Sequence, residues 1–378
     1  MKAPKIQDLD TPTRVLLGPG PGMPHPRVIR ALIAPTLGHL DPKMFAILKE
    51  EQELLRYVFQ TDNAWTFVIS GTGTAGMETA LTNLIEPGDI VLACIHGYFG
   101  ARLAEIAERL GATVDRIERP LGEIFNIEEI DSALRKKKYK FMTIVHAETS
   151  TGAEQLFIKE IAAAAHEHGS LIVLDTVTSL GGIPVKIDEW EVDIAYSASQ
   201  KNLNAPSGLA PITISSRAQE TIEKRIKPVA SLYLDLKQYS NYWEGLHSYH
   251  HTISSSLHFG LREGLRIIAE ESLEKTFARY RANAEILWNG LDKLSLRPFI
   301  PMEYRLPSLT SVHVPNGIDP HKIRIELLNR YNIEIGSGFG TLRDKVWRLG
   351  LMGYSSSKEN ITLLLAALNE LINTRTTI

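Results

Sequence analysis

A lysine and an aspartate near the middle of the chain combine the residue types that amine-based catalysis requires. Lys201 lies in a loop of small polar residues after an apolar run, and Asp175 ends the apolar run Leu171–Asp175. A lysine amine can form an imine, and a carboxylate can keep a pyridine nitrogen protonated so that the ring takes up electrons. Either residue alone has an ordinary explanation, as a surface lysine or as a helix cap. Together they indicate the chemistry of pyridoxal phosphate (PLP).

The turn Gly71–Gly76 matches the pattern G-x-G-x-x-G between an expected strand and an expected helix. This pattern suggests a dinucleotide site, which also requires an acidic residue at the end of the next strand. That strand, Ile90–Ile95, ends in His96, so an NAD-dependent dehydrogenase is disfavoured. Backbone N–H groups at a helix N-terminus can still bind a phosphate. Alone the motif would be explained as a ligand-free turn, but beside Lys201 and Asp175 it predicts a phosphate site.

Arg348 stands inside the apolar run Lys345–Leu351, where strand alternation predicts that it is partly buried. A buried arginine needs an anionic partner. The partner can be a structural carboxylate, although the sequence names none. The functional alternative is the carboxylate of an amino-acid or keto-acid substrate, which the planar guanidinium group binds well.

Three histidines, His247, His250 and His251, lie close together in the sequence and suggest a metal site. No glutamate follows His247 as it does in H-E-x-x-H, and no third ligand stands at a suitable spacing. We therefore expect no metal. Tyr249 and Thr252 in the same segment carry hydroxyl groups that suit a phosphate better.

Apolar runs typical of strands alternate with amphipathic helical patterns from about residue 65 to residue 215. The expected strands are Thr66–Ser70, Ile90–Ile95, Thr113–Ile117, Phe141–Ala147, Leu171–Thr176, Asp193–Ser197 and Ala210–Ser215, and the expected helices include Ala101–Leu110, Ile127–Lys137 and Ile158–His168. This alternation predicts an α/β fold with a largely parallel sheet covered by helices on both faces. Ligands bind at one edge of such sheets, where the strands end. The residues expected to converge there are Thr72, His146, Asp175 and Lys201.

The C-terminal third of the chain has a different pattern. A long helical stretch, Leu257–Leu294, reads as a spacer helix. Beyond it the expected strands are Thr310–Val314, Ile333–Gly336 and Lys345–Leu351, and the expected helices are Pro320–Tyr331 and Ser357–Ile372. The sequence therefore predicts an N-terminal arm (1–22), a large PLP-binding domain (23–260), and a linker helix with a smaller α+β domain (261–378). The stretch through Pro42 is expected to be an extended arm that needs another surface.

Composition limits the possible classes of protein. A chain of 378 residues exceeds one ordinary core, and 44% hydrophobic with 22% charged residues is typical of a globular protein. The net charge of −3 gives no general attraction to nucleic acid. The one cysteine, Cys94, is expected in the core and fits a reducing compartment. No signal peptide and no apolar run of roughly 20 residues is present, so we expect no membrane span and a cytoplasmic location.

Motifs in a consistent order run nearly from end to end of the chain. They include Leu16–Pro21, Gln60–Asn63, Ser70–Gly73, His146–Gly152, Asp175–Gly182, Ser199–Pro206, Tyr249–Thr252 and Trp347–Gly350. With them the chain resembles the alanine–glyoxylate and serine–pyruvate aminotransferases, class V members of the fold-type I PLP enzymes. The resemblance implies their fold, a mainly parallel seven-stranded sheet sandwiched by helices plus a smaller C-terminal α+β domain.

The resemblance also implies roles for matching residues. Lys201 matches the Schiff-base lysine, Asp175 the partner of the pyridine nitrogen, and Arg348 the arginine that binds the substrate carboxylate. The other implied cofactor contacts are Thr72, Gly73, Thr74, Phe99, Thr149, Ser150, Val177, Gln200, Tyr249 and Thr252. One hydrogen bond to the cofactor falls at either Thr149 or Ser150. Phe99 stands where a tryptophan often stacks on the ring, and Thr74 departs from the histidine that relatives carry.

The implied reaction moves the amino group of alanine or serine to glyoxylate, giving glycine and pyruvate or hydroxypyruvate. Tyr249 and Thr252 match groups that reach the phosphate of a neighbouring subunit, which implies a homodimer. Serine–glyoxylate and ureidoglycine–glyoxylate aminotransferases share almost all these motifs and remain alternatives. Residues Leu37–Asp41 and Tyr249 look more like the alanine and serine type. A non-catalytic binding protein is disfavoured because Lys201 is retained, and a cysteine desulfurase because Cys94 stands within a strand.

Overall fold

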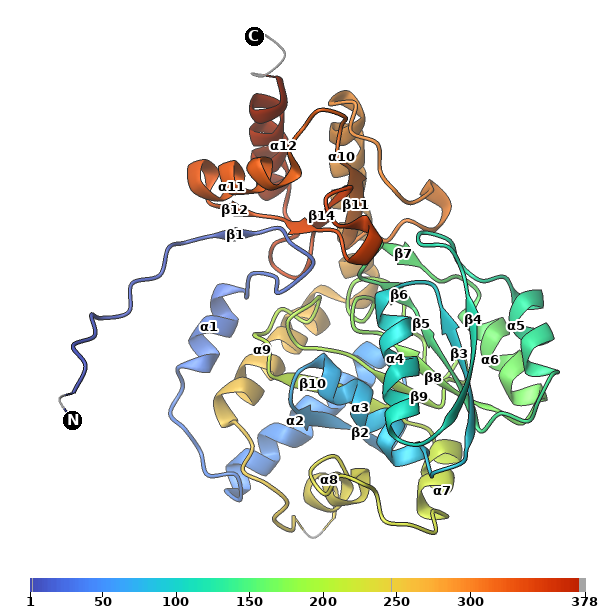
Figure 1. Ribbon diagram of the computed structural model, residues 1–378. Coiled ribbons are helices and arrows are strands. Elements are labelled where there is room, and N and C mark those ends of the chain that lie inside the picture. The colour runs from blue at the N-terminus through green and yellow to red at the C-terminus, as the bar shows by residue number, and fades with distance from the viewer. Residues whose placement is uncertain (2, 246, 374–378) are drawn as a thin grey trace.

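Hydrophobic side chains gather in two main clusters, one in the larger part of the chain and one in the C-terminal part. The computed structural model describes residues 1, 3–245 and 247–373. Figure 1 shows the C-terminal part above the larger part, with the N-terminal segment extending away to one side. The predicted domain boundaries after residues 22 and 260 stay a prediction.

A seven-stranded sheet forms the centre of the larger part. Its strands are β2 (Trp65–Ser70), β3 (Ile90–Ile95), β4 (Thr113–Glu118), β5 (Phe141–Val145), β8 (Leu171–Asp175), β9 (Ile194–Tyr196) and β10 (Leu209–Ile214). Their order is β2-β10-β9-β8-β5-β3-β4, and only the pairings of β10 within this sheet are antiparallel. Most of these strands are buried along their whole length, which explains their continuous apolar runs. The predicted mainly parallel, seven-stranded sheet is confirmed.

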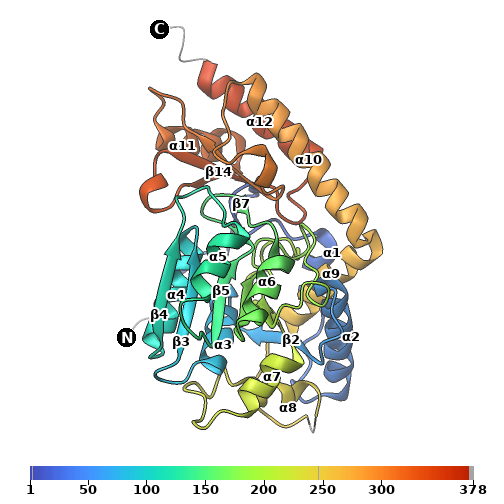
Figure 2. The same cartoon turned by 90° about the vertical axis from the view of Figure 1, so that its right-hand side faces the viewer.

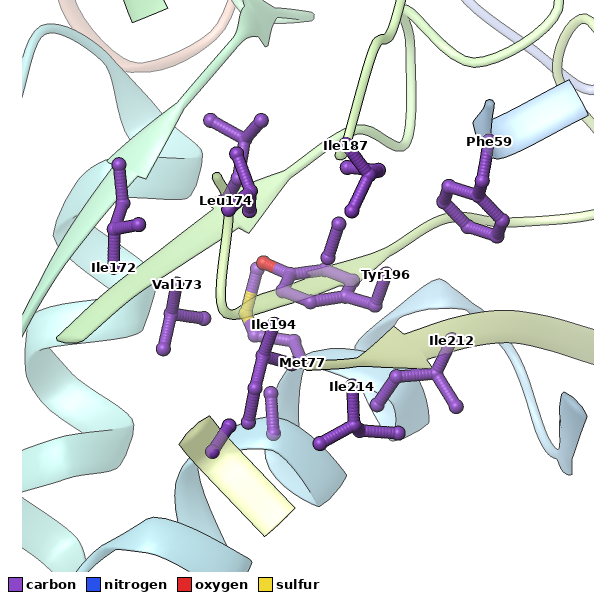
Figure 3. Packing of buried hydrophobic residues seen from close by; sticks show 14 of the residues in the cluster. Phe59, Met77, Ile172, Val173, Leu174, Ile187, Ile194, Tyr196, Ile212 and Ile214 are labelled. Carbon is purple, nitrogen blue, oxygen red and sulfur yellow. The ribbon is translucent and has the colours of Figure 1, made fainter. Parts of the chain in front are cut away.

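Helices cover both faces of this sheet. Helices α3 (Gly73–Leu84) and α4 (Tyr98–Arg109) lie against one face, and α5 (Ile127–Leu134) and α6 (Ile158–Glu167) lie against the other (Figures 1 and 2). Right-handed crossovers between parallel strands require this division. Figure 3 shows the packing that results, with Tyr196 among apolar side chains that include Val173 and Ile194 of two paired strands.

The N-terminal region is only partly extended. The short strand β1 (Val15–Leu16) pairs with β12 (Ile333–Glu334) of the C-terminal part. Helix α1 (Pro26–Leu32) and helix α2 (Pro42–Phe59) follow, each with a proline in its first turn. The expectation of an extended arm through Pro42 is therefore wrong for α1. Two further helices, α7 (Ser216–Glu223) and α8 (Leu236–Trp243), and the small ribbon of β6 (Ala147–Glu148) and β7 (Ala153–Glu154) complete the larger part.

The expected spacer helix is two helices. Helix α9 (Ser255–Glu271) ends at Ser272, whose φ is 72°, and α10 (Leu273–Lys293) begins immediately after it. The Ser272 hydroxyl accepts a hydrogen bond from the Lys275 N–H and so caps α10. Helix α9 packs on α1 and α2, whereas α10 packs on α12 (Lys358–Asn373) of the C-terminal part. The prediction of one continuous helix is wrong. The break falls at a serine, and no glycine or proline marks it in the sequence.

The C-terminal part is an α+β unit, as expected. The antiparallel strands β11 (Leu309–His313), β14 (Val346–Gly350) and β13 (Gly336–Ser337) lie in that order, and α10, α11 (Pro320–Tyr331) and α12 pack near them. In Figure 2 the long helices α10 and α12 run side by side. Within the described ranges, no helix is both long and apolar enough to cross a bilayer.

Candidate active site

Loops at the ends of the central strands enclose a small cavity. It is lined by Thr72, Gly73, Thr74, Met77, Phe99, Val145, Thr149, Asp175, Val177, Gln200 and Lys201. All of these except Met77 and Val145 were named from the sequence. The structure thus brings the lysine, the aspartate and the predicted phosphate turn to one place, at the edge of the sheet where ligands bind in such folds.

Asp175 ends β8 and is 2% exposed. One of its carboxylate oxygens accepts a hydrogen bond from the Val177 N–H at 2.8 Å, and the other accepts one from the Tyr196 hydroxyl at 2.7 Å. Burial nevertheless raises the pKa of the Asp175 carboxyl to about 7. In the described part of the chain no cationic side chain pairs with it. The site therefore holds a fixed carboxylate that a cationic ligand would keep ionised.

Lys201 faces the same cavity, and its Nζ donates a hydrogen bond to the Pro19 carbonyl. Burial and the Arg348 guanidinium lower the pKa of the Lys201 amine to about 8, and Asp175 opposes them. Gly20 lies so close that a Cβ there would meet the Lys201 Cδ and Nζ at 2.7 Å. The N-terminal turn thus positions an amine that loses its proton more easily than an exposed lysine, as a nucleophile requires.

The predicted phosphate turn begins α3. Thr72 is the N-cap residue, but its side chain makes no capping hydrogen bond, so the first N–H groups of the helix are open to an anion. A Cβ at Gly73 would lie 2.9 Å from the Ala198 Cβ, which explains the glycine. The Oε1 atom of Gln200 is buried without a hydrogen-bond partner. Such an unsatisfied amide beside an open helix N-terminus fits a polar ligand.

Phe99 and Val177 both line the cavity, where an aromatic and an aliphatic surface can hold a planar ring. Phe99 is fixed by Glu148, whose buried carboxylate accepts a hydrogen bond from the Phe99 N–H at 3.2 Å. The same carboxylate accepts hydrogen bonds from the Ser150 N–H and hydroxyl. Of the two alternatives from the sequence, Thr149 therefore lies on the cavity, and Ser150 is used to hold Glu148.

Arg348 lies on β14 and is 5% exposed, so the predicted burial is confirmed. Its Nε donates to the Ser337 carbonyl at 2.7 Å, and its Nη1 donates to the Thr149 carbonyl at 3.0 Å. Burial lowers the pKa of its guanidinium to about 10. Among the described residues no carboxylate forms an ion pair with it. The Glu148 carboxylate acts on this guanidinium group only from beyond ion-pair distance, so a buried cation held beside Thr149 is suited to bind a carboxylate.

Three residues named from the sequence lie elsewhere. Tyr249 is 61% exposed, Thr252 is also exposed, and neither lines the cavity of its own chain. His146 is buried against the Trp190 ring, with the ring centroids 5.3 Å apart, and faces a different hollow. The expectation that His146 converges with Lys201 is therefore wrong, because its side chain packs on Trp190 and lines another hollow.

Of the three clustered histidines, His250 and His251 lie within hydrogen-bond distance of each other, with their Nδ1 atoms 3.0 Å apart, and each of the three also has another partner. His247 and His250 each bond a backbone carbonyl, and His251 bonds the Ser70 hydroxyl at 2.6 Å. No group of three possible ligands is arranged around a metal within the residues that the structure describes. Cys94 is fully buried, and burial raises the pKa of its thiol well above the ordinary value.

Four contributors were missed from the sequence. Met77 follows Gly73 by one helical turn, and that spacing could have identified it. Val145 ends β5 in an ordinary apolar run. Tyr196 reaches Asp175 because β8 and β9 pair these two residues, which requires knowledge of the register. Glu148 acts through Phe99 and Ser150, and its motif alone does not show this role.

Comparisons with known proteins agree with this geometry. The model of the family described as aminotransferase class-V matches residues 29–364. The chain is 40% identical to the (S)-ureidoglycine–glyoxylate transaminase of Bacillus subtilis, over 97% of this chain and 92% of the relative. It is also 40% identical to the alanine–glyoxylate aminotransferase of Rattus norvegicus, over 96% and 88% of the two chains. The crystal structure of alanine–glyoxylate aminotransferase from Nostoc sp. superposes with a TM-score of 0.96, at 46% identity and 97% coverage of both chains.

Proposed function

The chain belongs to the class-V aminotransferase family, whose members use PLP, and from that premise we propose that it moves the amino group of a small amino acid to glyoxylate. The amino donor is alanine or serine, and the products are glycine and pyruvate or hydroxypyruvate. The ureidoglycine–glyoxylate and alanine–glyoxylate relatives both carry glyoxylate in their names, which supports glyoxylate as the acceptor.

The observation that carries the proposal is a pair of buried charges without ion-pair partners in the described chain. The two groups are the Asp175 carboxylate and the Arg348 guanidinium group. Both lie close enough to Lys201 for their charges to act on the pKa of its amine. Leaving buried charges unpaired is costly in free energy. A pyridine nitrogen that carries a proton and a substrate that carries a carboxylate would supply the two missing partners.

The residues around the cavity fit PLP. The open N-terminus of α3 and the side-chain N–H of Gln200 would donate hydrogen bonds to the phosphate, and Phe99 and Val177 would contact the ring. Asp175 would hold the proton on the ring nitrogen, with Tyr196 and the Val177 N–H keeping the carboxylate in place. When bound, PLP supplies a ring that takes up the electron pair left at the substrate Cα.

The chain's own groups then have distinct tasks. The Lys201 amine would hold the cofactor and, once freed from it, would accept the proton that leaves the substrate Cα. The Pro19 carbonyl accepts a hydrogen bond from that amine and so holds it beside the cavity. Arg348 orients the substrate carboxylate, because two backbone carbonyls already fix its guanidinium plane. Thr72, Gly73, Thr74 and Thr149 also line the cavity, and we assign them as contacts to the cofactor.

We also propose that two copies form a homodimer with shared active sites. Tyr249 and Thr252 support this, since both hydroxyl-bearing residues are exposed and are free to reach the phosphate site of a second copy. The division into arm, large domain and small domain belongs to the same proposal, as does a cytoplasmic location, which the single buried Cys94 suits. Sedimentation at several protein concentrations tests the dimer, and a protein that stays monomeric contradicts it.

A second donor, (S)-ureidoglycine, is the alternative. The specific observation in its favour is the 40% identity to the Bacillus subtilis transaminase that acts on it. Both donors pass their amino group to the same acceptor, so the buried groups described above serve either reaction equally.

The proposal is tested by incubating the purified, PLP-loaded enzyme with glyoxylate and, separately, alanine, serine or ureidoglycine. We expect formation of glycine, measured by chromatography, with alanine or serine as donor. Glycine formed with ureidoglycine alone would select the alternative donor. Enzyme that carries PLP and makes no glycine with any donor would overturn the proposed acceptor.

A further inference from the structure

Three aromatic rings meet beside Arg348. Phe339 stacks on Tyr98 with ring centroids 4.9 Å apart, and it meets Phe99 edge to face at 6.4 Å. Tyr98 and Phe99 also meet edge to face, at 5.4 Å. Phe339 comes from the C-terminal part of the chain, whereas the other two rings begin α4. This aromatic cluster therefore bridges the two parts of the molecule at the rim of the site.

The aromatic cluster separates two hollows. The cavity at Lys201 measures about 110 Å³, and a second hollow of about 420 Å³ lies next to it. Neighbours in the sequence line them from opposite sides: Phe99 and Thr149 face the first, and Tyr98 and Ser150 face the second. Phe339 lines only the second hollow. The larger space thus lies beside the site, with adjacent residues of the chain lining one hollow or the other.

Phe339 also covers the carboxylate-binding group. Its ring centroid lies 4.2 Å from the Arg348 guanidinium carbon, a distance at which cation and ring attract each other. The backbone holds it there: a Cβ at Gly338 would meet the Leu342 carbonyl oxygen at 2.1 Å, and Gly340 has a φ of 50°. The close approach at position 338 requires glycine and the positive φ at position 340 favours it, and the tight turn fixes the ring over the guanidinium group.

We propose that Phe339 determines the chain length of the keto acid that this enzyme accepts. With the carboxylate held at Arg348, a substituent longer than that of glyoxylate or pyruvate would extend toward the aromatic cluster. The ring blocks it from the 420 Å³ hollow, which has room for a longer side chain. Phe339 is a positioning and specificity residue that also steadies Arg348. The inference rests on the aminotransferase function proposed above and names its substrate class as 2-keto acids of two or three carbons.

The test is Phe339→Ala in the PLP-loaded enzyme. We expect KM for glyoxylate to rise about twofold to thirtyfold, the range that loss of one cation–π contact implies, with kcat changed less than about threefold. We expect kcat/KM for 2-oxobutyrate and 2-oxopentanoate to rise relative to glyoxylate by about tenfold. The ring is 38% exposed, so its loss should leave the core intact. Phe339→Tyr keeps the ring and should behave as the wild type does.

A second readout is independent of turnover. Calorimetric titration of the loaded enzyme with acetate and hexanoate should show hexanoate gaining affinity relative to acetate in Phe339→Ala. Phe157→Ala is the matched control, because Phe157 is also a partly exposed phenylalanine, 52% exposed, and it lines a different hollow.

An unchanged preference between short and long keto acids in Phe339→Ala, with wild-type activity intact, would overturn the role of Phe339. A uniform loss of kcat for all acceptors would do the same. Wild-type enzyme inactive with every amino donor and glyoxylate would instead contradict the proposed function, so the two failures are distinguishable.

Discussion

Ionisable side chains are buried in two regions of this molecule, and the two regions differ in whether these side chains pair with each other. Between α2 and α9, Glu51 and His258 are both fully buried, and the Glu51 carboxylate lies 2.7 Å from the His258 ring. Around Lys201, Asp175 and Arg348 are also buried, but neither forms an ion pair within the described residues. In the first region each group has the other as its partner, although Oε1 of Glu51 and Nε2 of His258 make no hydrogen bond to the described residues. The second region leaves its charged groups for a ligand.

The difference follows from where the sequence places each group. Glu51 and His258 face each other from two packed helices, and burial raises the pKa of Glu51 while His258 opposes that change. Asp175 ends a strand of the large sheet, and Arg348 belongs to a separate sheet of the C-terminal part. Asp175 lines the cavity, and neither side chain forms an ion pair within the described residues, so the hydrogen bonds that each makes leave part of its desolvation for a ligand to compensate. Variants at the two regions should therefore fail in opposite ways.

The largest effect is expected at Asp175. Asp175→Asn keeps the shape but cannot hold a proton on the ring nitrogen, so kcat should fall about a thousandfold or more. The melting temperature of the ligand-free protein should stay the same or rise, because an unpaired buried carboxylate is removed. Steady-state kinetics and thermal unfolding measure the two effects. A strongly destabilised Asp175→Asn protein would show that this carboxylate is structural, as Glu51 is.

At the other region, Glu51→Ala should lower the free energy of unfolding by about 3–5 kcal/mol, the cost of breaking a buried pair. The activity of the molecules that remain folded should be unchanged. Denaturant unfolding followed by circular dichroism measures the loss. The double variant Glu51→Leu with His258→Leu is the control and should recover much of it, since both charges are then absent. Lost kcat in folded Glu51→Ala protein would remove the distinction between the two regions.

Arg348→Met should raise KM for glyoxylate about tenfold to a hundredfold, because charge-assisted hydrogen bonds to the carboxylate are lost. Its kcat should change less. Arg305 is a matched control, since it is 9% exposed and donates to the Ile300 carbonyl away from the cavity. If Arg305→Met and Arg348→Met change KM equally, Arg348 has no special part in binding the substrate.

A further effect concerns pH. Burial raises the pKa of Asp175 from 3.8 to about 7, so between these values the folded, ligand-free protein binds more protons than the unfolded chain does. The stability contributed by the protonated carboxyl is fully present below about pH 4 and is lost as pH rises to about 7. Asp175→Asn should abolish this part of the pH dependence. Unfolding curves from pH 4 to pH 8 on both proteins test it, and parallel profiles would contradict it.

The sequence was sufficient for the groups that lie in regular patterns. Apolar runs located the strands whose ends carry Asp175 and the phosphate turn, and Arg348 could be placed in a strand by alternation. Contacts that depend on register or on distant segments could not be found this way. Tyr196 meets Asp175 across two paired strands, and Glu51 meets His258 over 207 positions of sequence separation.

A helix break that carries neither glycine nor proline also could not be predicted from the sequence. Ser272 separates α9 from α10 with neither glycine nor proline, because its positive φ is stabilised by the cap that it provides. His146 stands at a strand end like the site residues, but its side chain packs on Trp190. Position along a strand therefore predicts the edge of the sheet at which a residue lies, and not the direction of its side chain.

The central claim is that Lys201 is the amine that carries PLP in a site completed by Asp175 and Arg348. Borohydride reduction of the purified, PLP-loaded protein, followed by peptide mass spectrometry, tests it most directly. The account predicts a pyridoxyl phosphate adduct on the peptide that contains Lys201, and none after the same treatment of Lys201→Ala. An adduct on another lysine, or wild-type protein that takes up no PLP, would contradict it.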